Sequence, residues 1–517
     1  MKRFKKLAGI VLALVMVMAL AVPAFAAAGP NGDPSVLEDT TNQTGTITVT
    51  NAVENSTSKL YRVLDLTAYN RDTNAYLYKV NSGWAGFFAD PATETAPGRN
   101  YVDIDDKGYV TWKDGADVKE FAKAALAWAK GNNVPEVASK VADATNGTNK
   151  QEEEGKLPTY TLTFADLPLG YYLLNSSDGA VCSLDTAAPN VTIENKNPQS
   201  TVEKTPVDTS TMVGKTLPFD IKFTAYPTGI QYKVTDTIKK GLSFSDDQFS
   251  AMTIAVGGTV LDTNALAAAG ITTTKTDTGF EVVFPAGYVQ GLPEEGVEVV
   301  IHYEMTVTAE GVTVVENDAT LNYGEGFEIG STSEPKVPTY CFQLVKLDGN
   351  SKKQIEGAEF SVYTAETEGE PIHFVKEDGT AHGEDDSRTE HAYHYRVATP
   401  EEIAAGGTTT TIVAGNVIVS GLGNGDYWLE ETKAPSGYNA IEGRQKFTIQ
   451  NADLMAGEAV DGVFDETSGV KVLNKTGSLL PSTGGIGTTI FYIGGGVLVV
   501  AAVVLLITKR RASVDDE

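Results

Sequence analysis

The sequence predicts a mainly β protein built from β-sandwich domains in tandem, and two observations support this. Segments rich in Thr, Val and Tyr, such as TGTITVTNAV and LPFDIKFTAY, alternate apolar with polar residues, which is the pattern of half-buried strands. Turn residues separate these segments at sandwich spacing. The chain has 517 residues, which exceeds the size at which a single hydrophobic core keeps growing. We therefore expect three or four domains.

The N-terminal residues have the pattern of a secretory signal peptide. Basic residues occupy positions 2, 3, 5 and 6, an apolar stretch covers 7–21, and Ala24-Phe25-Ala26 forms a small-x-small cleavage site. The alternative, a buried helix, does not explain why the three parts occur in this order. We expect residues 1–26 to be removed on export. Residues 27–40 are rich in Gly, Pro and Asp, and we expect a flexible lead there.

Composition excludes several classes of function. The formal net charge is -28, so the surface should repel phosphate backbones and we expect no nucleic-acid partner. The two cysteines, Cys182 and Cys341, fall in different predicted domains, and we do not expect them to pair. No Ser/His/Asp set, Cys/His pair or phosphate-binding loop is recognisable. We predict that the protein is not an enzyme and needs no cofactor.

Three predicted domains follow along the chain. Residues 41–198 read as a β-rich first domain with two helical insertions, VKEFAKAALAWAKGNN and the shorter PEVASKVADA. Residues 199–335 read as short strands with at most one helix, at TNALAAAG, and residues 338–475 repeat this style. The last two domains should therefore be all-β sandwiches.

Two polar clusters could suggest a metal site. Asp103, Asp105 and Asp106 precede Gly108 as in a calcium loop, but Lys107 stands at the fifth ligand position, which favours a hairpin turn. Four of the five histidines fall in one polar stretch, which we interpret as a surface insertion: His373, His382, His391 and His394. We predict no metal site in either cluster.

The C-terminal segment combines three signals. Residues 486–507 carry no charge and are long enough to cross a membrane as a helix, and the basic residues 509–511 follow as a positive-inside anchor. The five residues Leu480-Pro481-Ser482-Thr483-Gly484 match the LPXTG sorting signal of Gram-positive surface proteins. This resemblance implies that a sortase cuts between Thr483 and Gly484 and passes the threonyl carbonyl to an amine. We assign residues 476–517 to the sorting signal.

The predicted third domain carries a specific internal motif. Residues 427–438, YWLEETKAPSGY, fit the E-box of Gram-positive pilins, and with Lys346-Leu347-Asp348 and Gly357-Ala358-Glu359-Phe360 they resemble a collagen-adhesin B-type domain. The resemblance implies an amide bond between Lys346 and Asn474, promoted by Glu431. Burial supports this chemistry, since a buried lysine becomes a neutral nucleophile and a buried carboxylic acid can polarise an amide. The alternative is a surface lysine and an ordinary turn glutamate.

The predicted second domain has similar marks. Lys204 lies at its opening and Asn317 near its close, which resembles the middle domain of shaft pilins, where an aspartate replaces the glutamate. We prefer Asp236 to Asp220 as the acid because VTDTI matches the family pattern better. A strand lysine without a crosslink is the alternative. The first domain has Asn51 where the others offer a lysine, so we expect it to lack a crosslink and to be the most labile.

An acceptor for Thr483 is suggested between the first two domains. Shaft pilins carry a polymerising lysine on the last strand of the first domain, usually in a Val-Tyr-Pro-Lys context, and this chain has Lys196 in VTIENKNP, with Glu-Asn in place of Tyr-Pro. The resemblance implies that a pilus-type sortase joins Thr483 of one subunit to Lys196 of the next. A linker lysine is the alternative.

Together these motifs resemble a Gram-positive LPXTG-anchored backbone pilin of the SpaA type, with tandem Ig-like or collagen-adhesin-type sandwiches. The resemblance implies a major subunit of a covalent pilus that supports adhesion and is secreted and anchored to the cell wall. Its partners would be a sortase, identical subunits, minor pilins and peptidoglycan. The alternative is a single wall-anchored adhesin, or a minor pilin, that binds a host ligand.

Overall fold

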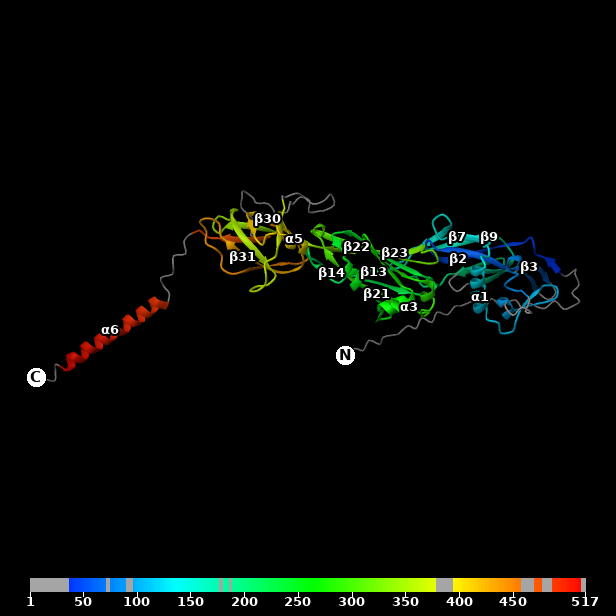
Figure 1. Ribbon diagram of the computed structural model, residues 1–517, viewed down its shortest axis with the longest axis horizontal. Helices are drawn as coiled ribbons and strands as arrows, with labels where there is room; N and C mark the ends of the chain where they lie inside the picture. The colour runs from blue at the N-terminus through cyan, green and yellow to red at the C-terminus, as the bar shows by residue number, and fades with distance from the viewer. Residues whose placement is uncertain are drawn as a thin grey trace.

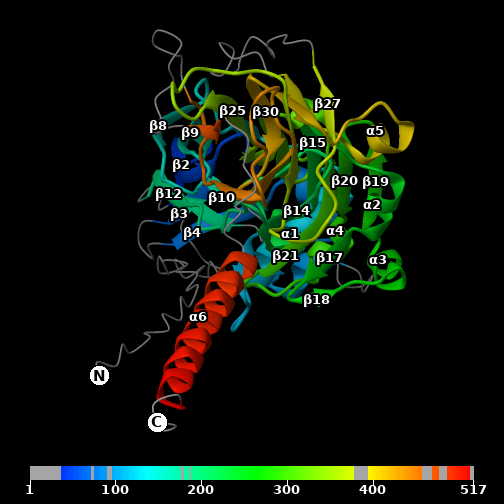
Figure 2. The same ribbon diagram turned by 90° about the vertical axis from the view of Figure 1, so that its left-hand side faces the viewer.

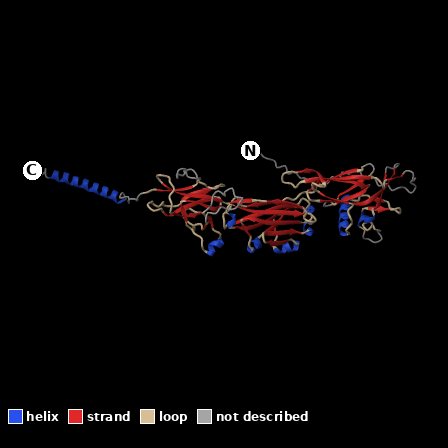
Figure 3. Ribbon diagram, turned by 90° about the horizontal axis from the view of Figure 1, so that it is seen from above, coloured by secondary structure: helices blue, strands red, loops and turns tan. Residues whose placement is uncertain are grey.

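The computed structural model describes residues 37–70, 75–89, 96–175, 180–185, 188–377, 394–456, 469–476 and 486–512. The described strands form pairs of sheets in three successive parts of the chain, which we call the N-terminal unit (37–194), the middle unit (203–338) and the C-terminal unit (340–474). The units lie in a row (Figures 1 and 3), and in the end-on view they lie behind one another (Figure 2). The predicted mainly β class is confirmed.

The N-terminal unit contains two larger sheets and a small hairpin. The first sheet comprises β1 (Leu37–Asp39), β3 (Thr57–Asn70), β4 (Ala75–Val80), β7 (Ala138–Val141), β10 (Gly170–Leu174) and β11 (Ala180–Leu184). The second comprises β2 (Thr44–Val53), β8 (Gly147–Gln151), β9 (Thr159–Pro168) and β12 (Asn190–Glu194). The hairpin comprises β5 (Val102–Ile104) and β6 (Val110–Trp112). Because β1 pairs with β3, the last residues of the predicted flexible lead are an ordered strand.

The first predicted helical insertion is α1 (Val118–Gly131). Asp117 caps its N-terminus by accepting hydrogen bonds from the backbone N–H groups of Lys119 and Glu120. Phe121 and Ala125 lie on its buried face, at the spacing of one helical turn. This helical insertion is confirmed.

The second predicted helix, at residues 135–144, is wrong. The segment contains the strand β7, which pairs antiparallel with β3. A helix of about ten residues is only marginally stable on its own. The free edge of β3 instead gives this segment backbone partners, and the pairing satisfies hydrogen bonds that a short helix would leave open at its ends.

The predicted turn at residues 103–108 is also present. Asp105 lies between β5 and β6, and its Oδ1 accepts from the backbone N–H groups of Lys107 at 2.9 Å and Tyr109 at 2.8 Å. Gly108 has a φ of +81°, which a glycine adopts without strain. The acidic cluster therefore makes a hairpin turn, as predicted.

The middle unit pairs two larger sheets. One comprises β13 (Glu203–Pro206), β14 (Thr216–Ala225), β16 (Leu242–Ser243), β17 (Thr253–Val256), β18 (Thr259–Val260) and β21 (Val297–Val307). The other comprises β15 (Tyr232–Lys240), β19 (Thr272–Thr276), β20 (Gly279–Phe284), β22 (Val314–Tyr323), β23 (Ile329–Ser333) and β24 (Lys336–Pro338). Its α-helix α3 (Thr263–Ala269) lies at the segment TNALAAAG, where the sequence allowed one helix. Two further short helices, α2 (Asp246–Ala251) and α4 (Ala286–Val289), were not predicted.

The C-terminal unit is built in the same way. One sheet comprises β25 (Tyr340–Asp348), β27 (Phe374–Lys376), β28 (Tyr395–Val397), β30 (Asn416–Leu422) and β33 (Val470–Asn474). The other comprises β26 (Ala358–Tyr363), β29 (Ile412–Ala414), β31 (Gly425–Lys433) and β32 (Gln445–Ile449). The first strand, β25, pairs in parallel with the last strand, β33, so the beginning and the end of the unit lie side by side.

The middle and C-terminal units share one hydrophobic core. The connection between β13 and β14 reaches into the C-terminal unit, where the backbone N–H of Val213 donates to the carbonyl oxygen of Gly421 at 2.9 Å. Val213 is buried there, and α5 (Pro400–Ala405) lies at the same junction (Figure 1). The contacts between the N-terminal and middle units include ion pairs at 3.9 Å from Lys119 to Glu294 and from Lys130 to Glu325.

Beyond the units, α6 (Ile486–Ala512) covers the predicted membrane span. Within the stretches whose side chains the structure describes, which in α6 are residues 492–508, no helix meets the length and apolarity that crossing a membrane requires. The membrane role of α6 stays a prediction. The predicted signal peptide, the sorting pentapeptide 480–484 and the histidines at 382 and 391 lie outside the described residues.

Candidate functional site

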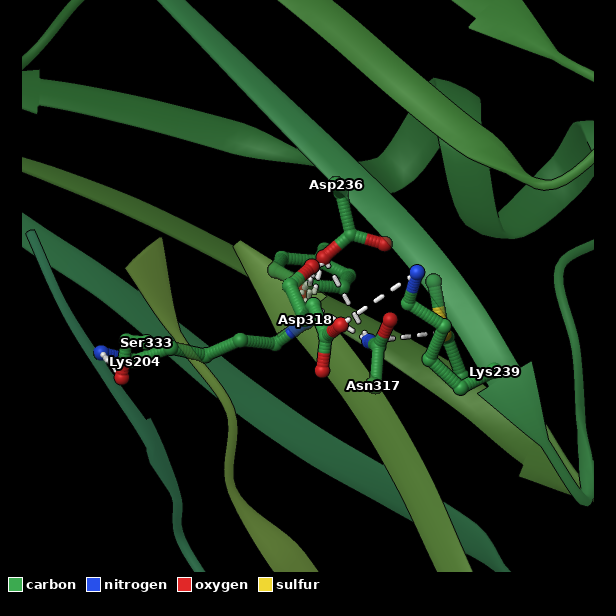
Figure 4. A network of polar contacts seen from close by, with 8 residues as sticks. Lys204, Asp236, Lys239, Asn317, Asp318 and Ser333 are labelled. Carbon is green, nitrogen blue, oxygen red and sulfur yellow. Dashed lines mark hydrogen bonds and ion pairs between the residues drawn. The ribbon is translucent and has the colours of Figure 1, made fainter. Parts of the chain in front are cut away.

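Lys204, Asp236 and Asn317 meet inside the middle unit (Figure 4). Asp236 on β15 and Asn317 on β22 lie on neighbouring strands, with Asp236 opposite Ala319 and Asn317 opposite Ile238. Because side chains alternate along a strand, these two side chains share the inner face of one sheet. Lys204 extends from β13 of the other sheet, and its Nζ lies 2.5 Å from Asp236 Oδ2.

The polar groups of this site are shielded from water. The side chains of Lys204 and Asp236 are fully buried, and Asn317 is 1% exposed. Burial lowers the pKa of Lys204 to about 8, although the attraction of Asp236 opposes the shift. Burial raises the pKa of Asp236, because a charged carboxylate is poorly solvated there. Both shifts favour the neutral amine and the neutral acid.

Two further residues contact the amide of Asn317, and the sequence analysis did not single them out. Its Nδ2 lies 3.3 Å from the hydroxyl oxygen of Tyr303 and 3.3 Å from Sδ of Met305, both on β21. The Tyr303 hydroxyl also donates a hydrogen bond to Asp236 Oδ2. In a strand such as β21 (Val297–Val307) a tyrosine on the inner face is an ordinary core residue, so the sequence offers no signal for this role.

The C-terminal unit brings together Lys346, Glu431 and Asn474. Lys346 on β25 pairs with Val472 on β33, and Asn474 lies two residues further along β33 on the same face. The Nζ of Lys346 donates a hydrogen bond to Asn474 Oδ1 and lies 3.4 Å from Glu431 Oε1. Glu431 approaches from β31 of the opposite sheet, and its two oxygens accept from Asn474 Nδ2 at 2.9 and 3.0 Å.

The polar groups of this second site are also buried. Lys346 has no exposed surface and Asn474 is 1% exposed. Burial lowers the pKa of Lys346 to about 8, against the opposing attraction of Glu431. The backbone N–H of Ile441 donates to Glu431 Oε2 at 2.8 Å and helps to fix the carboxyl group. The amine therefore lies against the amide that it would attack.

The two sites use opposite arrangements of the same three groups. In the middle unit the acid and the asparagine share a sheet and the lysine crosses from the other sheet. In the C-terminal unit the lysine and the asparagine share a sheet and the acid crosses. In each case an amine, an acid and an amide are buried close together, which can favour a single intramolecular condensation.

Asp220, the alternative acid, lies elsewhere. It is 25% exposed on β14, and its carboxylate contacts His302 Nδ1 at 2.7 Å and Lys222 Nζ at 3.5 Å. The N-terminal unit offers no lysine at the corresponding position on β2, where Ile47 and Val49 face the core. Asn51 instead lies at a bulge of β2 with a φ of +57°.

Lys196 lies two residues beyond the end of β12, not within the strand. Its side chain is 54% exposed, and its Nζ contacts Glu194 Oε2 at 3.2 Å. Of the histidines with described positions, His373 Nδ1 contacts Thr408 Oγ1 at 3.0 Å and His394 Nδ1 accepts from the N–H of Ile418 at 3.3 Å. The described residues contain no group of three His, Cys, Asp or Glu side chains placed to hold a metal ion.

Two family models match the chain. Residues 341–461 match the SpaA prealbumin-like fold domain, and residues 473–513 match the LPXTG cell wall anchor motif. No curated protein matches the sequence. The predicted SpaA-type domain and LPXTG anchor are therefore confirmed in these two segments, and the anchor motif indicates a protein attached to the cell wall.

Several solved structures are similar to the chain. The T6 backbone pilin of serotype M6 Streptococcus pyogenes is 13% identical, with a TM-score of 0.45, over 84% of this chain and 99% of that chain. The major pilin SpaD of Corynebacterium diphtheriae is 18% identical, with a TM-score of 0.42, over 86% of this chain and 99% of that chain. The major pilin SpaA of the same organism is 13% identical, with a TM-score of 0.42, over 84% of this chain and 100% of that chain.

Proposed function

We propose that this wall-anchored protein is the major structural subunit of a covalent pilus, and that a Lys–Asn isopeptide bond closes each of its middle and C-terminal units. The observation that supports this best is the pair of buried lysine, acid and asparagine sites. A dry core does not ordinarily contain an ammonium group, since desolvating it is costly unless it is paired or becomes neutral. Condensation removes this cost permanently.

The reaction at the C-terminal site needs only the groups present. The neutral amine of Lys346 attacks Cγ of Asn474, while Glu431 gives a proton to the leaving Nδ2. The C–Nδ2 bond breaks, ammonia leaves, and Glu431 recovers a proton from the lysine nitrogen. The product is a secondary amide, and the carboxyl group returns to its starting state. Lys204, Asp236 and Asn317 would react in the same sense.

Polymerisation would join Thr483, in the C-terminal sorting signal, to Lys196, between the N-terminal and middle units. A pilus-type sortase would cut after Thr483 and transfer its carbonyl to Lys196 of the next subunit, and a terminal subunit would be passed to peptidoglycan. The exposure of Lys196 supports this choice, because an acceptor amine must be reachable by an enzyme. In the assembled fibre, which would support adhesion together with minor pilins, the internal amides would resist tension and reduction.

Intact-mass measurement of the expressed chain tests the two internal bonds. The wild type should be lighter than its sequence by two ammonia molecules. Lys204→Ala and Lys346→Ala should each be lighter by one, and Lys222→Ala, which removes an exposed lysine from the strand beside β13, should still be lighter by two. An unmodified mass for the wild type would contradict the proposal.

A further inference from the structure

Tyr303 occupies an unusual place in the middle-unit site. Its hydroxyl donates to Asp236 Oδ2, and the same oxygen lies 3.3 Å from Asn317 Nδ2. The tyrosine is 1% exposed, and its ring packs against Phe219 at a centroid distance of 5.8 Å and against Phe280 at 4.8 Å. The hydroxyl is thus fixed between the acid and the nitrogen that must leave.

The two sites differ in how the acid reaches the asparagine. Glu431 contacts Asn474 Nδ2 directly with both oxygens, at 2.9 and 3.0 Å. Asp236 is one methylene shorter, and its Oδ2 lies 3.4 Å from Asn317 Nδ2. Its Oδ1 and the Oδ1 of Asn317 have no hydrogen-bond partner among the described residues. The C-terminal site therefore has direct acid-to-nitrogen contact, whereas the middle site has a weaker contact and a tyrosine beside it.

We propose that Tyr303 is a catalytic residue of the middle-unit crosslink and relays a proton from Asp236 to the leaving nitrogen of Asn317. This inference rests on the proposed function. As the amine of Lys204 adds to Cγ, the lone pair of Nδ2 is no longer delocalised into the carbonyl group, and Nδ2 becomes basic. The Tyr303 hydroxyl gives its proton to Nδ2 and takes one from the protonated Asp236. The C–Nδ2 bond breaks and ammonia leaves, and Asp236 then recovers a proton from the lysine nitrogen, so the tyrosine and the acid are both unchanged.

The surroundings of the hydroxyl suit a relay. Burial and the neighbouring Asp236 raise the pKa of Tyr303 well above its ordinary value, so the hydroxyl holds its proton at neutral pH. A relay of this kind gives and takes a proton together, and does not require a free phenolate. Lys204 Nζ lies 2.5 Å from the same oxygen, Asp236 Oδ2, and 3.2 Å from the carbonyl oxygen of Asp318 (Figure 4). The amine that must lose a proton and the hydroxyl that would pass one on therefore contact the same carboxyl oxygen.

A timed crosslinking experiment with Tyr303→Phe tests the relay. The full chain is made in a short cell-free translation pulse, samples are unfolded in acid at intervals, and the peptides joining Lys204 to Asn317 and Lys346 to Asn474 are counted by mass spectrometry. Loss of one positioned proton donor should slow the middle crosslink by at least about a hundredfold, the lower end of the usual range for general acid–base groups. The C-terminal crosslink should form at the wild-type rate, and it reports correct folding in the same molecules.

Met305→Leu is the matched control. It also changes a side chain in contact with Asn317 Nδ2, but neither methionine nor leucine can transfer a proton. We expect near-normal crosslinking in this variant. Equal rates for Tyr303→Phe and the wild type would overturn the relay, and so would equal slowing in both variants, which would indicate packing alone. If the wild type formed neither crosslink, the proposed function itself would fail.

Discussion

At the scale of single residues, two lysines are decisive, because the fold buries them where a positive charge is poorly solvated. Burial lowers the pKa values of Lys204 and Lys346 to about 8. At physiological pH a substantial fraction of each amine is therefore neutral, and deprotonating the rest requires little free energy. Lys196, by contrast, is 54% exposed, and the proposed joining of subunits there would need an enzyme. Lysine would thus serve two reactions in this protein: buried lysines would form the internal crosslinks, and an exposed lysine would accept the next subunit.

Asn474→Ala should make the stability of the chain depend on pH in a way that the wild type does not. The variant retains Lys346 but cannot form the amide. The pKa of Lys346 is about 8 in the folded state and about 10.5 in the unfolded state. Between pH 8 and pH 10.5 the unfolded state therefore binds more protons than the folded state. The free energy of unfolding rises with pH wherever this holds, so the variant becomes more stable across that window. The expected gain is about 3 kcal/mol between pH 8 and pH 10.5.

Urea unfolding of the C-terminal unit at several pH values measures this dependence. The crosslinked wild type has no titratable amine at residue 346, and its unfolding free energy should lack the rise. A variant whose stability stays level or falls from pH 8 to pH 10.5 would show that Lys346 is not held with a lowered pKa.

Glu431→Ala should abolish only the C-terminal crosslink. The variant loses the carboxyl group that contacts both Lys346 and Asn474, so the intact mass should be lower than the sequence mass by one ammonia molecule instead of two. Glu430→Ala is the matched control, because the neighbouring side chain is 42% exposed and pairs with Arg444. It should retain both crosslinks. Full crosslinking in Glu431→Ala would exclude this acid from the reaction.

At the scale of elements, the connection between β13 and β14 links the middle unit to the C-terminal unit through the contact between Val213 and Gly421. Gly421 has a φ of +86°, and a Cβ there would lie 2.9 Å from Val213 Cγ2. Gly437 has a φ of +85°, but a Cβ there would meet nothing within 4 Å. Substitution by alanine should therefore strain the backbone equally at both positions, but only residue 421 also contacts the other unit.

Gly421→Ala should loosen the junction more than Gly437→Ala does. Both substitutions should incur the left-handed backbone penalty of roughly 1–2 kcal/mol, but only the first pushes the 207–215 connection away from the C-terminal unit. Limited trypsin digestion measures this through cleavage after the exposed Lys215. We expect faster cleavage in Gly421→Ala alone, and equal cleavage in the two variants would show that this contact does not hold the units together.

Much of the element-scale description follows from local sequence, and the exceptions have physical reasons. Period-two alternation predicts strands such as β14, whose Phe219 and Ile221 point inward, because a sandwich strand buries one face. β7 was missed because its state depends on the free edge of β3, which is distant in sequence. Tyr303 was missed for a related reason: only the packing of two sheets brings its hydroxyl to Asn317.

The residues of the candidate sites also differ in whether the sequence could predict them. A motif located Lys346, Glu431 and Asn474, and the fold brings all three together. The choice of Asp236 over Asp220 rested on a short pattern, and the structure places Asp236 beside Lys204 while Asp220 pairs with His302 on a more exposed surface. The sequence could indicate the candidate lysine, acid and asparagine because the proposed chemistry restricts their types, but packing determines which residues surround them.

At the scale of the whole molecule, the uncrosslinked N-terminal unit should unfold first on heating. It has its own core, and neither of the two lysine, acid and asparagine sites lies within it. Phe121→Ala, which empties a fully buried position of α1, should lower this first transition, by about 3–5 kcal/mol in unfolding free energy, and leave later transitions unchanged. Differential scanning calorimetry separates the transitions, and a variant that shifts all of them would contradict independent unfolding.

The central claim is that subunits are joined covalently through Lys196. An immunoblot of cell-wall extract boiled in SDS measures this directly, with the wild type, Lys196→Ala and, as a control, Lys156→Ala, which removes a lysine that is 61% exposed in the same unit. We predict a ladder of high-mass bands for the wild type and Lys156→Ala that collapses to the monomer in Lys196→Ala. A monomer band in all three would contradict the account and indicate a protein attached singly to the wall.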